Sequence, residues 1–282
     1  MQHADPAISF SDLHLRFGDL VLYEGLSLSV SRGKTLALIG RSGTGKSVLL
    51  KCALRLLVPD RGSISTLGTD VMAQTERSMV TVRKRVGIMF QNYALFDSLT
   101  VAENIAWPLR IEGWLDEAAI SARVAETLEA VNMPGIEAKR PASLSGGMKK
   151  RVSLARAIAN KPDVLFYDGP TTGLDPANAK RVDGIIQRLK DERGTTAILV
   201  THDMQTVDRV ADRVAMLHER TIAWQGPPSQ MRTEAPKFVR DFVTGNFRGE
   251  YDPARVRAML QGDRAAHEER GARAPHEERG LS

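Results

Sequence analysis

Two hydrophobic periods alternate along the chain, and together they predict a mixed α/β fold. Residues 8–30 alternate apolar and polar side chains on either side of a turn at Gly18-Asp19, as antiparallel strands do. Residues 58–91 keep a strand-and-turn character. From about residue 92 to residue 160 the apolar spacing becomes helical.

Continuous apolar runs with the length of buried strands occur at residues 35–39, 86–90, 164–168 and 196–202. Helices are predicted over residues 48–57, 116–131, 145–160 and 176–190. Fully apolar strands that alternate with helices are typical of a parallel sheet covered on both faces. We therefore expect such a sheet at the centre of the molecule.

The C-terminal part of the chain follows a different pattern. Residues 214–217 and 221–224 predict a β-hairpin, and residues 236–246 predict an amphipathic helix within an extension over about 227–260. Residues 262–282 contain the sequence His-Glu-Glu-Arg-Gly twice and lack large apolar side chains. Because such a segment cannot bury a core, we expect it to be a disordered, solvated tail.

The composition indicates a soluble, cytoplasmic protein. Of the 282 residues, 42% are hydrophobic and 26% are charged. No apolar run is long enough to cross a bilayer, and the N-terminus does not have the pattern of a signal peptide. The single cysteine, Cys52, is interpreted as a small buried hydrophobic residue. The net charge of +5 is mild, and no basic stripe interleaved with aromatic residues points to a nucleic-acid partner.

One glycine-rich stretch lies between the strand at 35–39 and the helix at 48–57. It has the form G-x-x-x-x-G-K-S, the phosphate-binding P-loop, and reads Gly40-Arg41-Ser42-Gly43-Thr44-Gly45-Lys46-Ser47. Glycines allow backbone N–H groups to turn toward an anion, and the positive end of the following helix points to the same place. In such a loop, Lys46 reaches the outer phosphates and the Ser47 hydroxyl ligates Mg²⁺. The predicted nucleotide-binding residues are residues 40–47 together with Val48 and, from its position before the first turn, Phe17.

Further motifs follow in a fixed order. They are Gln91, then Leu144-Ser145-Gly146-Gly147, then Asp168 at a strand end, then Gly173-Leu174-Asp175, and finally His202 at another strand end. In this set and order the chain resembles the ATPases of ATP-binding-cassette (ABC) transporters. The resemblance covers about residues 8 to 226, and it implies an ABC ATPase domain over residues 8–246.

The resemblance implies a fold and a role for each motif. The fold would be a P-loop NTPase (RecA-like) core with a parallel sheet, an N-terminal antiparallel β-subdomain and an inserted α-helical subdomain at about 92–160. Two copies of the chain would sandwich two ATP molecules, with residues 144–147 of one copy contacting the γ-phosphate held by the other. Asp168, His202 and Gln91 are the implied catalytic residues, and Ser47, Gln91 and Asp168 the implied Mg²⁺ ligands. Leu174 and Asp175 form the implied D-loop, and Phe17 would stack on adenine.

The chain departs from the family pattern at one position. ABC ATPases carry a glutamate after the aspartate that corresponds to Asp168, and that glutamate polarises the attacking water. Here the sequence is Asp168-Gly169-Pro170, so no side chain is present to do this. Loss of a general base costs about 10²- to 10⁴-fold in rate. Three explanations stay open: a natural slow or non-hydrolysing variant, an altered sequence, and pairing with a competent partner chain.

Longer stretches resemble one group within this family, the ATPase of the Mla (maintenance of lipid asymmetry, or toluene tolerance) phospholipid transporters. The stretches are residues 43–51, 90–106, 145–159 and 238–242. This resemblance implies a homodimer at the cytoplasmic face of the inner membrane, bound to integral-membrane permease subunits, with a lipid-binding substrate protein and a small regulatory subunit. The alternatives are the ATPase of an amino-acid importer and a non-hydrolysing, ATP-gated scaffold.

Overall fold

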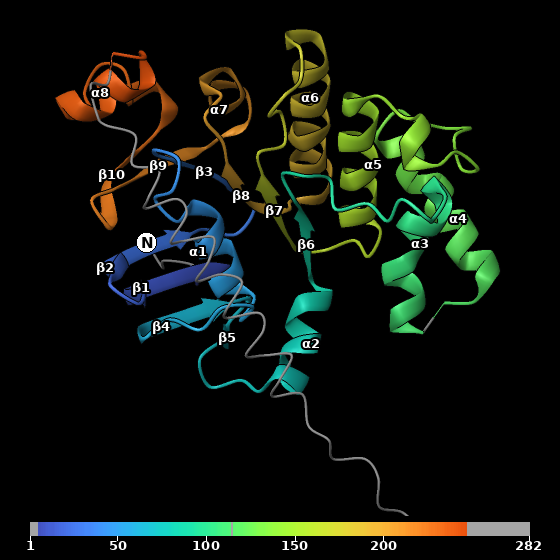
Figure 1. The fold of residues 1–282 in the computed structure, drawn as a ribbon, viewed down its shortest axis with the longest axis horizontal. Helices are drawn as coiled ribbons and strands as arrows, with labels where there is room; N and C mark the ends of the chain where they lie inside the picture. Colours follow the sequence, from blue (N-terminus) through green and yellow to red (C-terminus); the bar gives the residue numbers. More distant parts are fainter. Residues whose placement is uncertain (1–4, 114, 247–282) are drawn as a thin grey trace, which may run out of the picture.

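The computed structural model describes residues 5–113 and 115–246. At its centre lies a six-stranded sheet with the order β10-β9-β3-β8-β7-β6 (Figure 1). Its strands are β3 (Thr35–Ile39), β6 (Val86–Met89), β7 (Val164–Asp168), β8 (Thr196–Val200), β9 (Arg213–His218) and β10 (Thr221–Gly226). All neighbouring pairs are parallel except β9 and β10, which form the predicted hairpin.

A second sheet is antiparallel, as the alternating pattern at the N-terminus predicts. Its order is β2-β1-β4-β5, and its strands are β1 (Ile8–Phe17), β2 (Leu20–Val30), β4 (Arg61–Thr66) and β5 (Thr69–Asp70). Phe17 pairs with Leu20 across the predicted turn. This sheet lies on the opposite side of the molecule from helices α3, α4 and α5 (Figure 1).

The helices are α1 (Lys46–Ala53), α2 (Glu76–Lys84), α3 (Val101–Glu112), α4 (Glu117–Ala130), α5 (Gly146–Ile158), α6 (Pro176–Arg193), α7 (Met204–Val210) and α8 (Lys237–Val243), with short 3₁₀ turns at Pro141–Ser143 and Pro228–Gln230. Several begin at residues whose side chains accept a hydrogen bond from the first turn. Asp116 starts α4, Ser145 starts α5 and Asp175 starts α6 in this way. None of the helices in the described part of the chain has both the length and the apolar character needed to span a membrane.

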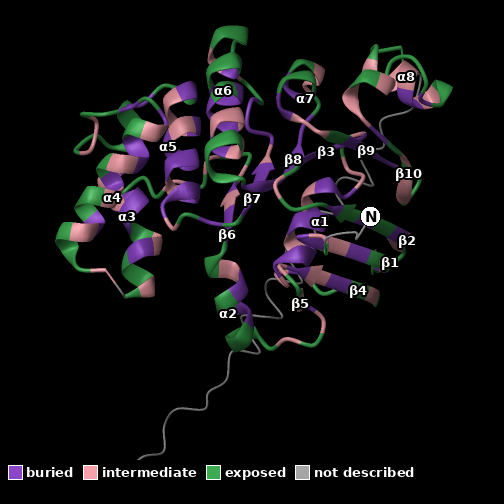
Figure 2. Cartoon of the chain, turned by 180° about the vertical axis from the view of Figure 1, so that it is seen from behind, coloured by how far each residue is buried: buried purple, intermediate pink, exposed green. Residues whose placement is uncertain are grey.

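The two faces of the central sheet belong to two hydrophobic cores. On β3, Ala37 and Ile39 pack into a core shared with α3, α4, α5 and α6. The alternate residues Leu36 and Leu38 pack into a core shared with α1 and the antiparallel sheet. Figure 2 shows the resulting buried central strands and the exposed outer surfaces of the helices. Because both faces are covered, the strands are apolar throughout, and the predicted α/β fold is confirmed.

The structure corrects several boundaries. Residues 58–91 contain a helix, α2, which buries only Met79 and Val82 and therefore leaves a weak apolar pattern. Helix α7 was also missed. Helix α1 ends at Ala53 instead of residue 57, because Arg55 takes a positive φ of 54° and turns the chain. The strand predicted over 196–202 ends at residue 200, and the one predicted over 86–90 ends at residue 89.

Helix α8 lies within the predicted amphipathic helix at 236–246 and buries Val239 in the larger core. The end of the predicted extension, residues 247–260, and the predicted tail at 262–282 lie outside the described residues.

Candidate functional site

The P-loop joins β3 to α1, and two of its glycines are required by close contacts. Gly40 and Gly45 have φ values of 143° and 103°, which are strained for any other residue. A Cβ on Gly40 would overlap the carbonyl oxygen of Leu217, and one on Gly45 would lie 2.9 Å from the Leu22 side chain. Gly45 precedes α1 without a side-chain cap, so N–H groups of the first turn remain available to an anion.

Lys46 is buried inside this loop, with only 5% of its surface exposed. Its Nζ donates hydrogen bonds to the carbonyl oxygens of Gly40 (2.8 Å) and Arg41 (2.6 Å). Burial lowers the pKa of this ammonium to about 8, although the nearby Asp168 carboxylate acts in the opposite direction. The ammonium of Lys46 is therefore poorly solvated and only partly neutralised by Asp168. Such a cation is suited to bind a phosphate.

Ser47 and Asp168 meet at the mouth of the loop. The Ser47 hydroxyl donates a 2.9 Å hydrogen bond to Asp168 Oδ1. Burial raises the pKa of Asp168, and the Ser47 hydrogen bond and the charge of Lys46 partly offset this rise. A hydroxyl and a carboxylate are hard oxygen donors, and Mg²⁺ at phosphate sites needs few protein ligands because water and phosphate supply the rest. The pair therefore fits Mg²⁺. Within the described residues, no cluster of three or more His, Cys, Asp and Glu side chains offers a fuller metal site.

A cavity of about 170 Å³ brings these groups together with distant parts of the chain. It is lined by Ser42, Gly43, Gly45, Lys46, Ser47, Gln91, Asp168, Gly169, Thr172, Val200 and His202. Partial desolvation, followed by the charge of Lys46, lowers the pKa of His202, so its imidazole is neutral at pH 7. A neutral imidazole can donate one N–H to a phosphate oxygen, and the cavity therefore has the donors and the charge for a triphosphate end.

The remaining predicted nucleotide-binding residues do not line this cavity. The carbonyl of Arg41 accepts hydrogen bonds from the Thr44 hydroxyl and from Lys46, which closes the loop. Val48 is buried in the core beneath it. Phe17 packs partly against the same core at the end of β1, outside the cavity lining, so its contact with adenine stays a prediction.

Gly169 takes a backbone conformation that suits glycine. Its φ is +59°, and a Cβ there would lie 2.8 Å from Thr172 Oγ1 and 3.4 Å from Gln91 Cγ. Its N–H donates to the carbonyl of Val200, and its own carbonyl accepts from Lys150. A side chain at position 169 would therefore meet both a left-handed backbone conformation and a close contact with Thr172.

The motif Leu144-Ser145-Gly146-Gly147, called the signature from here on, lies at the N-terminus of α5. Ser145 caps this helix by accepting a 3.3 Å hydrogen bond from the N–H of Met148. Leu144 is buried, whereas Ser145 and Gly146 are exposed. A Cβ on Gly147 would lie 3.1 Å from Asn178 in α6. The N–H of Asn178 donates a hydrogen bond to Oδ1 of Asp175, which forms the predicted D-loop with Leu174. The signature and the D-loop are therefore neighbours.

The signature residues do not line the cavity of their own chain. An exposed serine and two glycines at a helix start are suited to contact an anion on another molecule.

Comparison with known proteins agrees with this arrangement. A family model described as ABC transporter matches residues 23–172, more than half of the chain. The chain belongs to the ABC transporter family and is an ATP-binding subunit. Its fold matches that of cbiO1 from Clostridium perfringens, part of the cbiONQ transporter complex, with a TM-score of 0.75 and 28% identity over 82% of this chain and 92% of that one. A dimeric bacterial ABC transporter cassette matches with a TM-score of 0.73 and 25% identity over 78% and 98% of the two chains.

The curated relatives include ATP-binding proteins of methionine import and of phospholipid transport. The methionine import ATP-binding protein MetN of Brucella abortus is 41% identical over 79% of this chain, which spans only 60% of that relative's length. The intermembrane phospholipid transport ATP-binding protein MlaF of Haemophilus influenzae is 37% identical over 90% of this chain and 95% of its own. The chloroplastic protein TRIGALACTOSYLDIACYLGLYCEROL 3 of Arabidopsis thaliana is 36% identical over 87% of this chain and 76% of its own.

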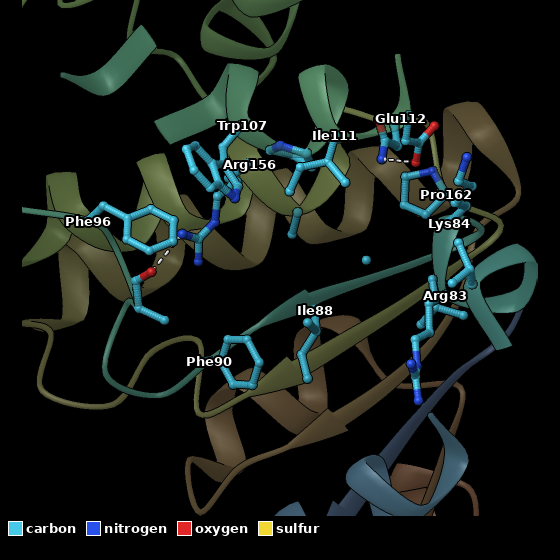
Figure 3. Close-up of a pocket in the computed structure, with 17 residues that line it drawn as sticks. Arg83, Lys84, Ile88, Phe90, Phe96, Trp107, Ile111, Glu112, Arg156 and Pro162 are labelled. Atoms are coloured by element: carbon cyan, nitrogen blue, oxygen red, sulfur yellow. Dashed lines mark hydrogen bonds between the residues drawn. The ribbon is translucent and has the colours of Figure 1, made fainter. Parts of the chain in front are cut away.

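A larger cavity of about 610 Å³ lies away from the P-loop of this ATPase, and sequence reasoning missed it. Figure 3 shows Trp107 and Ile111 of α3 on one wall, with Ile88 and Phe90 from the β6 segment opposite them. The rings of Phe96 and Trp107 contact each other at a tilt of 51°, with 5.3 Å between their centroids. Both residues are nevertheless 45% exposed, and Ile111 is 71% exposed. We call this cavity the apolar groove. Exposed apolar surface of this kind marks an interaction site.

A sequence signal for the groove existed. Trp107 and Ile111 are four residues apart, so they share a face of α3 that differs from the face of the buried Ile105 and Leu109. Lys150 was also missed. It is a fully buried lysine in α5, and burial lowers the pKa of its ammonium to about 8, offset in part by Asp168.

Proposed function

We propose that this chain powers phospholipid transport through an integral inner-membrane permease, by ATP-driven closure of a homodimer. The observation that carries the proposal is the combination of a cavity lined by the P-loop, Asp168 and His202 with an exposed signature at Ser145 and Gly146. Each copy holds half of an ATP site and offers the other half to its partner. ATP then shifts the population toward the closed dimer because it binds that state more tightly.

Each part of the bound Mg-ATP has its own set of protein groups. The N–H groups of residues 43–47 and the ammonium of Lys46 hold the phosphates. The oxygens of Ser47 and Asp168, with Gln91, hold Mg²⁺, which when bound neutralises phosphate charge. His202 donates its N–H to the γ-phosphate, and Phe17 stacks on the adenine.

The permease docks at the apolar groove. The groove borders Phe90, which directly precedes Gln91, so a helix seated there senses the segment that reaches the ATP cavity. The chain is held at the cytoplasmic face of the inner membrane through this contact. A lipid-binding substrate protein and a small regulatory subunit complete the complex.

Hydrolysis by this chain is slow because Gly169 supplies no base. Gly169→Glu should raise turnover by about 10²- to 10⁴-fold. Two features of the backbone work against this gain. The φ of +59° costs about 1–3 kcal/mol for a residue with a side chain, and a residue before proline prefers an extended conformation.

Gly169→Gln is the matched control, since it makes the same backbone demand without a carboxylate. Mg-ATP binding should be the same in all three proteins. Wild-type turnover equal to that of the Glu variant would refute the impairment.

Two other functions have specific support. The 41% identity to the Brucella methionine ATPase favours amino-acid import. Gly169 favours an ATP-gated scaffold without a transport stroke.

The discriminating experiment is affinity purification of the tagged chain from membranes, followed by lipid analysis and an ATPase assay on the complex. Phospholipid that co-purifies with a permease supports the proposal. A permease that binds an amino acid points to import, and a partnerless protein counts against both transport functions.

A further inference from the structure

Lys150 is a buried cation that connects helix α5 to two residues of the ATP cavity. No part of its surface is exposed. Its Nζ donates hydrogen bonds to the carbonyl oxygens of Gln91 (2.7 Å) and Gly169 (2.8 Å). The ammonium also lies 5.1 Å from the centre of the Tyr93 ring. Charge-assisted bonds in a low-dielectric interior are strong, so these two carbonyls are fixed to α5.

The same face of α5 holds the chain that follows Gln91. Ser153 donates to the carbonyl of Tyr93 at 2.8 Å, and Arg156 donates to that of Ala94 at 2.6 Å. Residues 91–94 are therefore attached to α5 at several points. A displacement of this helix must move Gln91 with it, because the hydrogen bonds of Lys150 and Ser153 are shielded at least partly from water and are costly to break.

The N-terminus of α5 is the exposed signature, Ser145 and Gly146, about one turn before Lys150. The N-terminus of α5 is therefore exposed to a second molecule. Lys150 fixes the same helix to the ATP cavity of its own chain. Gln91 and Gly169 both line that cavity. The attachment at Gly169 holds the position where the family glutamate is missing.

We propose that Lys150 is a positioning residue that couples the two ATP sites of the dimer. When the signature of α5 contacts a phosphate in the partner's site, Lys150 transmits the displacement to Gln91 and Gly169 in its own site. Coupling between binding sites is reciprocal, so ATP in a chain's own cavity must also change the state of its signature. The transmission from the partner's site to Gln91 and Gly169 rests on the proposed homodimer. The effect of ATP on the signature of the same chain does not.

The reciprocal effect can be measured on the monomer. Hydrogen–deuterium exchange of residues 145–149 is compared with and without ATP, at a protein concentration where no dimer forms. We expect ATP to change this exchange by severalfold in the wild type and in Lys150→Arg, which keeps the donors. The change should disappear in Lys150→Met, which keeps the apolar stem alone. Lys149→Met is the matched control on the same helix.

The second measurement is ATP-driven dimerisation. Lys150→Met should keep the monomer's ATP affinity within about threefold and weaken dimerisation by about tenfold, a coupling of usual allosteric size. An unchanged response of residues 145–149 in Lys150→Met would overturn the proposal, provided thermal unfolding shows that the variant is folded. If the wild type never dimerises while the monomer response depends on Lys150, the homodimer is wrong and the coupling stands.

Discussion

The hydroxyl of Ser47 lies 2.9 Å from Oδ1 of Asp168, although 121 positions separate the two residues in the sequence. Ser47 lies in the first turn of α1, and Asp168 is the last residue of β7. The parallel order β3-β8-β7 brings both to the carboxyl edge of the sheet, where ligands bind in open α/β folds. This contact lies at the centre of the candidate ATP site.

Removing the charge of Asp168 should weaken the effect of Mg²⁺ on nucleotide binding. Asp168→Asn keeps an oxygen that accepts from Ser47 but loses the carboxylate. We expect the gain in ATP affinity on adding Mg²⁺ to fall by about tenfold, or ~1.4 kcal/mol, while Mg-free binding is retained. Titration calorimetry with and without Mg²⁺ measures this. Asp163→Asn, at an exposed ion pair with Arg85 before the same strand, is the control and should change neither affinity.

ATP affinity should depend on pH through Lys46. The pKa of its ammonium is about 8 in the free protein, and a bound phosphate favours the charged form. Affinity is therefore full below pH 8 and falls as pH rises through 8, by up to about tenfold per pH unit. The measurement is Mg-free ATP binding between pH 6.5 and 9.5. Lys46→Arg stays charged over this range, so its weaker binding should be independent of pH. A flat wild-type profile would contradict the assignment.

The contact between β6 and α5 should not tolerate a methyl group. A Cβ on Gly87 would overlap the backbone carbonyl oxygen of Ala157, which cannot rotate away. We expect Gly87→Ala to lower the free energy of unfolding by about 1–3 kcal/mol, as overpacking does. Gly184→Ala is the matched control. It lies on α6 with open space around its Cβ, and it should stabilise by about 0.5–1 kcal/mol. Urea denaturation compares the two, and equal effects would refute the steric argument.

A charge in the apolar groove should separate permease binding from nucleotide binding. Ile111→Asp places a carboxylate on a residue that is 71% exposed on α3, so folding and ATP affinity should be unchanged. Co-purification with the permease should fall by about tenfold or more, because the carboxylate loses its solvation in the docked complex. Val58→Asp changes a 41% exposed valine outside the groove lining and serves as the control. Normal recovery of the permease with Ile111→Asp would place docking elsewhere.

Much of the fold could be predicted from the sequence because its signals are local. The apolar runs of β3, β7 and β8 and the caps at Ser145 and Asp175 depend on neighbours a few residues away. Helix α2 escaped prediction because it buries only two side chains against the core. Met79 and Val82 have helical spacing, but they form an apolar face of only two buried residues.

Some features of the candidate site follow from the sequence, and others follow from the tertiary structure alone. The sequence by itself determined the P-loop, the order of the motifs and the absence of a carboxylate at position 169, since these are properties of residue identity. Only the tertiary structure decided that Gln91, Asp168 and His202 line one cavity, that Gly169 takes a positive φ, and that Trp107 and Ile111 face an open groove. It also placed Lys150, a residue type usually found in solvent, at the junction of α5 with that cavity. Such relationships depend on how distant strands and helices pack, and packing is fixed by contacts that no local pattern contains.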